Sequence, residues 1–151
     1  MAALSDYLES GLLNYLFRGQ AFAAPSNISI ALTSGVPHDS DTGETLPEVP
    51  SGLNGVSTGY ARVNLGAPAD TVWSYTTADD AQGSGIVRNS GQIVFPTALL
   101  DWGAVNGVAI TTHADYGSGQ LLMHAPLSNP RSIFAGDNVK FDYNTLEISF
   151  K

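Results

Sequence analysis

The residues of this chain that could bind a metal ion or act in catalysis are three histidines and several closely spaced acids. The histidines are His38, His113 and His124, and neither an HExxH pair nor a Cys/His cluster accompanies them. His124 shares a predicted strand face with Leu122, which favours a half-buried or interface histidine over a metal ligand. We therefore expect no metal site and no cofactor.

The acidic run from Asp39 to Glu44 alternates acids with small residues, as calcium-binding loops do. An EF-hand loop also needs glycine at its sixth position and a bidentate glutamate at its twelfth. Counted from Asp39, these positions hold Glu44 and Pro50. We interpret the run as a solvated acidic loop, with a weak and irregular calcium site as the alternative.

Motifs for nucleophilic or phosphate chemistry are missing from the sequence. It contains neither GxSxG nor GxxxxGK, and the glycine-rich run 83–91 is followed by neither a lysine nor a helical pattern. The pairs Asp79 with Asp80 and Asp101 with Asp115 could supply acid and base carboxylates, but acids are far commoner in turns. We expect no catalytic residue and a protein that is not an enzyme.

Asp101 and Trp102 stand between two apolar runs, where a desolvated carboxyl could have a raised pKa suited to catalysis. The flanking residues favour a structural corner instead. Pro96 ends the preceding strand, and Gly103 permits a positive φ. We expect Asp101 to accept hydrogen bonds from nearby backbone N–H groups, as in an Asx-turn, and Trp102 to cover one end of the core.

Composition and charge exclude several classes of protein. The chain has 151 residues, enough for one domain with its own core, and it has no cysteine. Six Lys and Arg oppose fourteen Asp and Glu, so the net charge of −8 argues against direct nucleic-acid binding. The apolar run Gly11–Phe17 is too short to span a bilayer, and Met1–Tyr7 lacks the positive charge of a signal peptide. We expect a soluble protein made in the cytoplasm, with no membrane partner.

The N-terminal residues predict a short helix that begins after Ser5 or Asp6 and ends at Gly19. Apolar residues recur at helical spacing over a broad face. This face packs either on its own domain or on a partner, and the sequence leaves the two open. The residues of the candidate interface are Leu4, Tyr7, Leu8, Leu12, Tyr15, Leu16 and Phe17. We expect residues 1–22 to form an N-terminal helical arm and residues 23–151 a single β-domain.

From Ser26 onward the hydrophobic period changes to two, which indicates strands. The interrupting run His38–Gly59 is rich in Gly, Pro and acids, and predicts a long exposed loop with little regular structure. The segments 138–143 and 145–150, divided near Asn144, predict a hairpin with one buried face. The remaining predicted strands lie in 27–34, 59–65, 71–77, 91–95, 105–112, 120–127 and 131–134. Eight or nine short strands with a single helix predict a mainly β fold, an antiparallel, jelly-roll-like β-sandwich.

The motifs also resemble those of a widespread group of small tailed-bacteriophage virion proteins. The resemblance is strongest in NSGQIVFPTALLDWGAVNGVAI, residues 89–110, and in the segment 117–150. An SDYLE-type helix, a strand like ISIALTS and a GYAR segment precede them in the same order. The acidic loop, TVWSYTTADDAQG and THADYGSG depart from the pattern. The resemblance implies a non-enzymatic structural component of the virion, and members are often labelled tail fibre proteins.

Within the virion, we expect a capsid decoration or cement protein on the outer surface of the particle. It would bind the major capsid protein or other virion proteins as a homodimer or homotrimer. Composition favours this role, because the chain has no repeat or heptad pattern for a fibre shaft. The alternative is a tail, fibre or baseplate component that contacts the host surface. A carbohydrate-binding module or a small hydrolase of sandwich fold is a more remote alternative.

Overall fold

The computed structural model describes residues 3–75 and 85–149. This part of the chain contains one helix, α1 (Asp6–Arg18). The longer strands are β2 (Ser29–Thr33), β7 (Ile86–Asn89), β9 (Gly103–Thr111), β10 (Leu121–Ile133) and β12 (Glu147–Ser149). The short strands are β1 (Ala3–Leu4), β3 (Gly52–Leu53), β4 (Val56–Ser57), β5 (Val63–Asn64), β6 (Trp73–Ser74), β8 (Ile93–Val94) and β11 (Lys140–Phe141).

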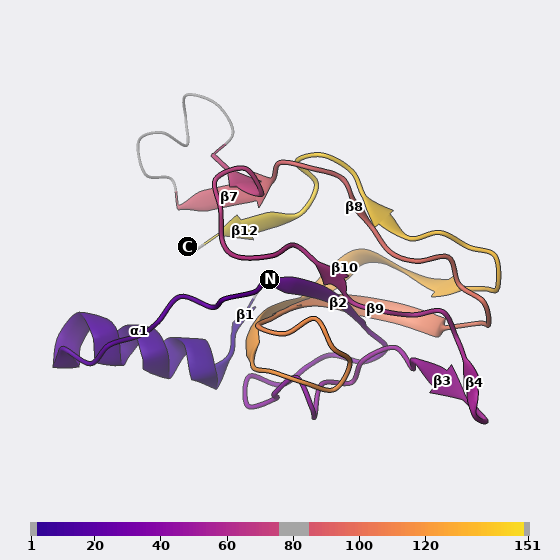
Figure 1. The fold of residues 1–151 in the computed structure, drawn as a ribbon, viewed down its shortest axis with the longest axis horizontal. Helices are drawn as coiled ribbons and strands as arrows, with labels where there is room; N and C mark the ends of the chain where they lie inside the picture. Colours follow the sequence, from indigo (N-terminus) through magenta and orange to yellow (C-terminus); the bar gives the residue numbers. More distant parts are fainter. Residues whose placement is uncertain (1–2, 76–84, 150–151) are drawn as a thin grey trace.

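The strands form two layers (Figure 1). The larger layer is a five-stranded sheet in the order β1-β10-β9-β2-β5, and the second consists of the small sheets β12-β7-β6 and β11-β8. All of these pairings are antiparallel. The prediction of a mainly β, antiparallel fold with one N-terminal helix is confirmed. The two layers stack as in a sandwich, but the divided second layer leaves the sandwich unclosed.

The main core fills the space between the layers. Ile30 and Leu32 of β2 and Val105 of β9 face inward from the large sheet, and Ile93 and Phe95 meet them from the second layer. Each of these five side chains is at most 2% exposed. Burial of large apolar side chains contributes about 1.5 to 3 kcal/mol each, so this cluster is the main source of stability.

The outer face of β2 is also buried, because the segment 38–59 folds back over it. Leu46 packs on Ala31, Ala109 and Leu121 in a second, smaller apolar cluster. The backbone N–H of Val49 donates to the carbonyl of Leu32 at 3.0 Å. The expectation of a long exposed loop is therefore wrong for Leu46, Glu48 and Val49, which are buried. The run has little regular structure, as expected, apart from the short β3–β4 hairpin.

A buried ion pair fixes this loop. Glu48 and Arg62 approach to 2.8 Å, with side chains 2% and 0% exposed respectively. Arg62 also donates to the backbone carbonyls of Gly43 at 2.9 Å, Ser118 at 2.7 Å and His113 at 3.0 Å. Because these carbonyls belong to two different loops, one guanidinium holds both loops against the large sheet.

Tyr60 completes the polar cluster. Its hydroxyl donates to Glu48 Oε1 at 2.7 Å and accepts from the backbone N–H of Leu32 at 3.0 Å. Burial and, second, the carboxylate of Glu48 raise the pKa of Tyr60 well above its ordinary value of 10.0. The phenol is therefore a permanent donor at neutral pH.

The predicted C-terminal hairpin is wrong. β11 pairs with β8 and β12 pairs with β7, so the two segments join different sheets. The buried side chain of Asn89 sets this path: its amide donates to the carbonyl of Asp142 at 2.8 Å and its oxygen accepts from the N–H of Leu146 at 2.8 Å. Asn144 turns the chain at φ 60°. Phe150 lies outside the described residues.

Two other segments also differ from expectation. The predicted strands in 120–127 and 131–134 form one strand, β10, with a register irregularity between Pro126 and Arg131. Ile86–Asn89, within the glycine-rich run 83–91, forms β7, which is not among the predicted strands.

Replacing Arg62 with methionine should lower the free energy of unfolding by about 3 to 5 kcal/mol, because it leaves Glu48 buried and without its countercharge. Lys140→Met is the matched control, since Lys140 pairs with Asp142 where both side chains are more than half exposed. It should cost less than about 1 kcal/mol. Chemical denaturation of both variants tests this; equal losses would contradict it.

The raised pKa of Tyr60 predicts alkaline destabilisation. Tyrosines in the unfolded chain lose their protons near pH 10, whereas folded Tyr60 keeps its proton. The unfolded state then binds fewer protons, so stability falls as pH rises above about 10. Tyr60→Phe should make this fall shallower, and Tyr143→Phe, at an exposed position, should not. Denaturation midpoints measured across the alkaline range test the prediction; identical slopes for all three proteins would refute it.

Candidate functional site

Helix α1 is capped at its N-terminus by Ser5, whose Oγ accepts a hydrogen bond from the N–H of Leu8 at 3.2 Å. Asp6 and Glu9 lie in the first turn, where their charges suit the helix dipole. The helix ends at Gly19, which adopts a left-handed φ of 63° and donates its N–H to the carbonyl of Asn14. Of the two predicted caps, Ser5 is the one used.

The base of the helix is attached to the large sheet. β1 pairs with the start of β10, and the N–H of Ser5 donates to the carbonyl of Leu122 at 3.0 Å. The N–H of Asp6 donates to the carbonyl of Asp39 in the folded-back loop at 2.8 Å. Leu4 and Leu8 are partly buried against the main core. These contacts fix the direction in which the helix leaves the domain.

One side of the helix is covered by the returning chain. The ring of Phe22 lies 5.9 Å from that of Tyr7, and a Cβ added to Gly11 would lie 2.3 Å from Phe22 Cε2. Only glycine at position 11 permits this approach without movement of the ring.

The distal part of the helix carries apolar side chains in solvent. We call Leu12, Leu13, Tyr15, Leu16 and Phe17 the distal helix surface. Leu16 is 66% exposed and Phe17 78% exposed, and no residue of α1 is buried. Figure 1 shows the helix pointing away from both layers. The distal helix surface is an apolar patch that the described part of the chain does not cover.

The predicted interface residues thus fall into two groups. Leu4, Tyr7 and Leu8 contact other parts of the same chain. Tyr15, Leu16 and Phe17 are exposed, and Leu12 is half-buried. Sequence analysis missed that Gly11 and Phe22 separate the covered side from the free side. The role of the exposed side of α1 as an interface stays a prediction. The division of the chain into an arm, 1–22, and a β-domain, 23–151, also stays a prediction.

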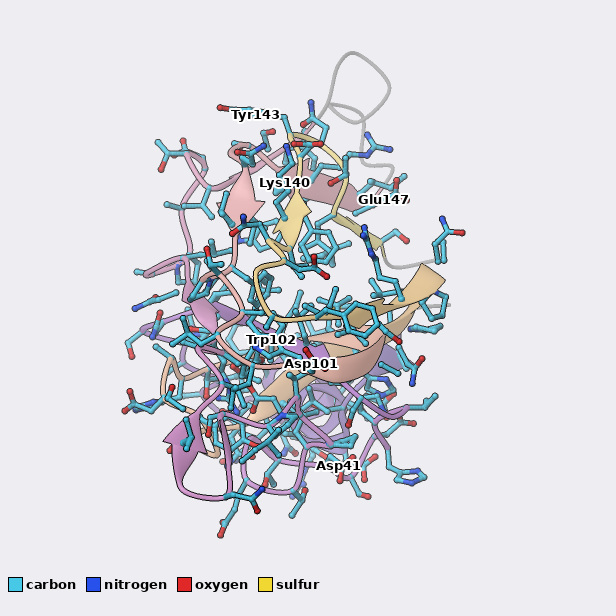
Figure 2. The ribbon with its side chains drawn as sticks, turned by 90° about the vertical axis from the view of Figure 1, so that its right-hand side faces the viewer. Asp41, Asp101, Trp102, Lys140, Tyr143 and Glu147 are labelled. Carbon is cyan, nitrogen blue, oxygen red and sulfur yellow. The ribbon has the colours of Figure 1, made fainter. Side chains whose placement is uncertain are left out.

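At the predicted corner, Trp102 is 2% exposed and its Nε1–H donates to the carbonyl of Thr58 at 2.9 Å. Gly103 has a φ of 78°. Asp101 is exposed and accepts from the N–H of Ala135 at 2.9 Å. This bond joins segments distant in sequence, so it is not the local Asx-turn expected. Asp101 and Trp102 lie beside the large sheet, below the second layer that carries Lys140 and Tyr143 (Figure 2).

The other candidate residues are dispersed. His124 is buried, and its Nε2 lies 2.9 Å from Asp39 Oδ1. His113 and Asp115 form an exposed pair. Within residues 3–75 and 85–149 no group of three or more His, Cys, Asp and Glu could hold a metal ion, and no helix is long and apolar enough to cross a membrane. Asp79 and Asp80 lie outside the described residues.

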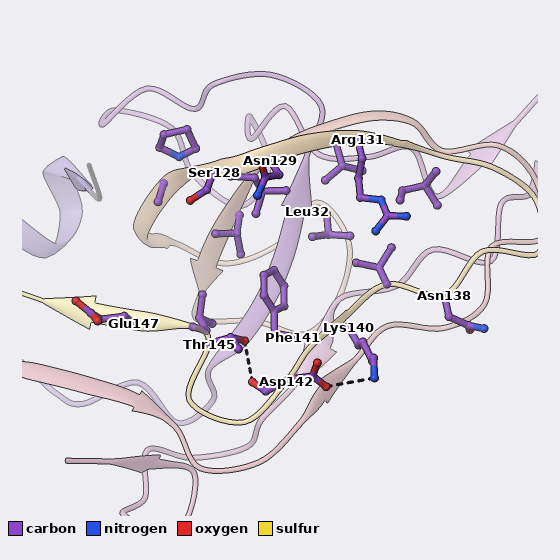
Figure 3. A pocket seen from close by; sticks show the side chains of 18 residues that line it. Leu32, Ser128, Asn129, Arg131, Asn138, Lys140, Phe141, Asp142, Thr145 and Glu147 are labelled. Atoms are coloured by element: carbon purple, nitrogen blue, oxygen red, sulfur yellow. Dashed lines mark hydrogen bonds and ion pairs between the residues drawn. The ribbon is translucent and has the colours of Figure 1, made fainter. Parts of the chain in front are cut away.

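A cleft that sequence analysis missed opens between the layers. Its volume is about 590 Å³, and it lies between β10 and the segment 138–147 (Figure 3). Apolar side chains of Leu32, Val105 and Ile133 form part of its lining. Its polar and charged lining residues are Ser128, Asn129, Arg131, Asn138, Lys140, Asp142, Thr145 and Glu147. The polar run SNPR, residues 128–131, interrupts a mostly apolar strand and is the sequence feature that could have indicated the cleft.

Comparison with known proteins places the chain in a family. The sequence matches, over residues 3–149, the model of the family described as podophage GP4 fiber I protein gp80. The chain belongs to this family. No protein in the curated set matches it.

Membership of this fibre family confirms the resemblance to bacteriophage virion proteins, and the chain is a virion structural protein. The match spans both the projecting helix and the β-layers. It gives no support to a capsid decoration role, and it agrees better with the alternative of a tail or fibre component.

In this fibre protein, Trp102→Ala should lower the free energy of unfolding by about 3 to 5 kcal/mol, the cost of deleting a large buried aromatic side chain. Asp101→Asn should cost far less, because an amide oxygen still accepts the hydrogen bond from Ala135. Thermal melting of the two variants compares them. A melting temperature unchanged by Trp102→Ala would show that the corner does not close the core.

Proposed function

We propose that the chain is a non-enzymatic component of a phage fibre, attached to another virion protein through the distal helix surface. One observation carries the proposal: α1 is held firmly at its base and leaves Leu13, Leu16 and Phe17 in solvent. The family's description as a fibre protein supports it.

The energetics favour attachment by this surface. Each large apolar side chain of the distal helix surface contributes about 1.5 to 3 kcal/mol when it is fully buried in a partner. The contacts at Ser5 and Asp6 orient the helix before binding, so little further ordering is needed. An amphipathic helix that enters a groove of its partner is a common mode of protein recognition.

A fibre location leaves the rest of the β-domain free to face outward. No residue of α1 lines the cleft, which is formed by β2, β9, β10 and the segment 138–147, and Figure 1 shows β8 of the second layer on the side away from α1. Attachment through the helix therefore does not require their surfaces. Contact with the host surface through this part of the domain is the role we propose for it.

The test compares two single substitutions of matched exposure. Leu16→Asp charges the distal helix surface, and Val36→Asp charges an apolar site elsewhere; both side chains are 66% exposed. Each variant is mixed with particles that lack the protein, and the particles are sedimented. Leu16→Asp should lower bound protein at least tenfold, because a carboxylate is costly to bury, whereas Val36→Asp should bind like the unaltered chain.

Immunogold labelling of intact particles tests the location. Label at the fibres, in a copy number far below that of the major capsid protein, is the expected result. Label spread over the head in comparable copy number would overturn the fibre proposal and favour capsid decoration. Equal binding by both aspartate variants would move the attachment surface away from α1.

A further inference from the structure

We propose that the cleft between β10 and the segment 138–147 binds an acidic saccharide, with Arg131 pairing with its carboxylate and Phe141 packing on a sugar ring. The inference rests on the proposed function, because it names the class of host-surface molecule that an outward-facing β-domain would bind.

The cleft exists because neither layer closes over the other at this point. Pro126 of β10 pairs with Gly107 and Arg131 pairs with Val105, so residues 127–130 bulge out of the ladder. Opposite them, β11 has only two residues. The resulting space of about 590 Å³ lies within the range of small-molecule sites.

Arg131 supplies the charge. It is exposed, lines the cleft, and has no hydrogen-bond or ion-pair partner among the described residues. By contrast, Arg18 bonds to Asn14 and Arg62 is fully engaged in the core. A guanidinium presents paired N–H groups that match the two oxygens of a carboxylate.

The other charged groups that line the cleft are largely neutralised. Lys140 lies 3.2 Å from Asp142, and Glu147 pairs with Arg88 at 2.7 Å. Arg131 is thus the cation left to recognise an anion. Because the chain carries a net charge of −8, a ligand with isolated carboxylates suits it better than a densely charged polyanion.

Phe141 supplies the apolar contact. Its ring is half-buried, packs edge-on against Phe95 with centroids 6.4 Å apart, and points into the cleft toward the β10 side (Figure 3). The C–H groups on one face of a sugar ring are apolar and suit an aromatic surface. Asn129, Ser128 and Thr145 around it offer amide and hydroxyl groups for sugar hydroxyls.

An added peptide strand fits the cleft less well. Strand addition needs a continuous row of free backbone N–H and C=O groups along the edge of β10. Pro126 and Pro130 have no N–H, and the bulge at 127–130, which contains Pro130, interrupts the ladder. The polar lining and the broken strand edge together favour a saccharide.

The experiment titrates the full chain with a panel of hexuronate-containing oligosaccharides, each paired with its carboxyl-reduced neutral form, by calorimetry. The acidic forms should bind, and reduction of the carboxylate should weaken binding at least tenfold. Arg131→Gln should weaken binding of the acidic forms to the level of the neutral ones. Phe141→Leu should weaken both forms. Arg18→Gln, which removes a cation from the helix, is the control and should change neither.

Three results would overturn the inference: no binding across the panel at millimolar ligand, binding that Arg131→Gln leaves unchanged, or self-association of the chain that Arg131→Gln abolishes. Particle sedimentation of the same variants distinguishes a failure of saccharide binding in the cleft from a failure of attachment through the distal helix surface. Arg131→Gln should bind particles normally, because it leaves the distal helix surface intact, whereas Leu16→Asp should bind saccharide normally.

Discussion

The ion pair between Glu48 and Arg62 is the interaction on which the arrangement of this domain depends. Burying two charges is costly, and their attraction compensates only when the remaining hydrogen-bonding groups are also satisfied. Here the guanidinium makes its bonds to Glu48 and to carbonyls of two loops, and Tyr60 donates to the same carboxylate. The ion pair therefore contributes little net stability, and its main effect is to select one arrangement of the loops.

The effect of this pair extends to the helix. Glu48 holds the segment that contains Asp39, and Asp39 contacts the base of α1 in two ways. Its carbonyl accepts from the N–H of Asp6, and its carboxylate lies 2.9 Å from the buried His124, which pairs with Ala3 of β1. The loop 38–59, which the sequence predicts to face solvent, thus contacts and positions the N-terminal end of the helix. Asp39, Asp41 and Glu48 of this loop accept hydrogen bonds or pair with a histidine at defined positions.

Sequence periodicity predicted the parts of the fold that depend on local pattern. Helix α1 and the buried strands β2 and β9 follow from spacing alone, whereas the choice of Ser5 over Asp6 as the cap does not. Periodicity did not predict which strands pair, because an alternating strand specifies which face is buried but not which strand lies beside it. The C-terminal hairpin is the example: a single buried side chain, that of Asn89, directs its two segments to different sheets.

The two surfaces to which we assign binding were predictable to different degrees. The apolar stripe of α1 is visible in the sequence, but its free part is defined by the packing of Phe22 on Gly11, a contact between a helix and a later segment. The cleft had little local signal, since it requires residues of β10 and of 138–147 to face each other across an unclosed sandwich.

The long strand β10 connects these two surfaces. Its first residues pair with β1 at the base of the helix, and its later residues, around Arg131, border the cleft. His124 and Arg131 pair with Ala109 and Val105 of β9, four residues apart, which at about 3.3 Å per residue corresponds to roughly 13 Å. That separation lets a partner cover the distal helix surface while the cleft stays open. Because β10 pairs with β9 on both sides of the bulge at 127–130, the two surfaces keep a fixed spacing, as the proposed attachment at one end and exposure at the other require.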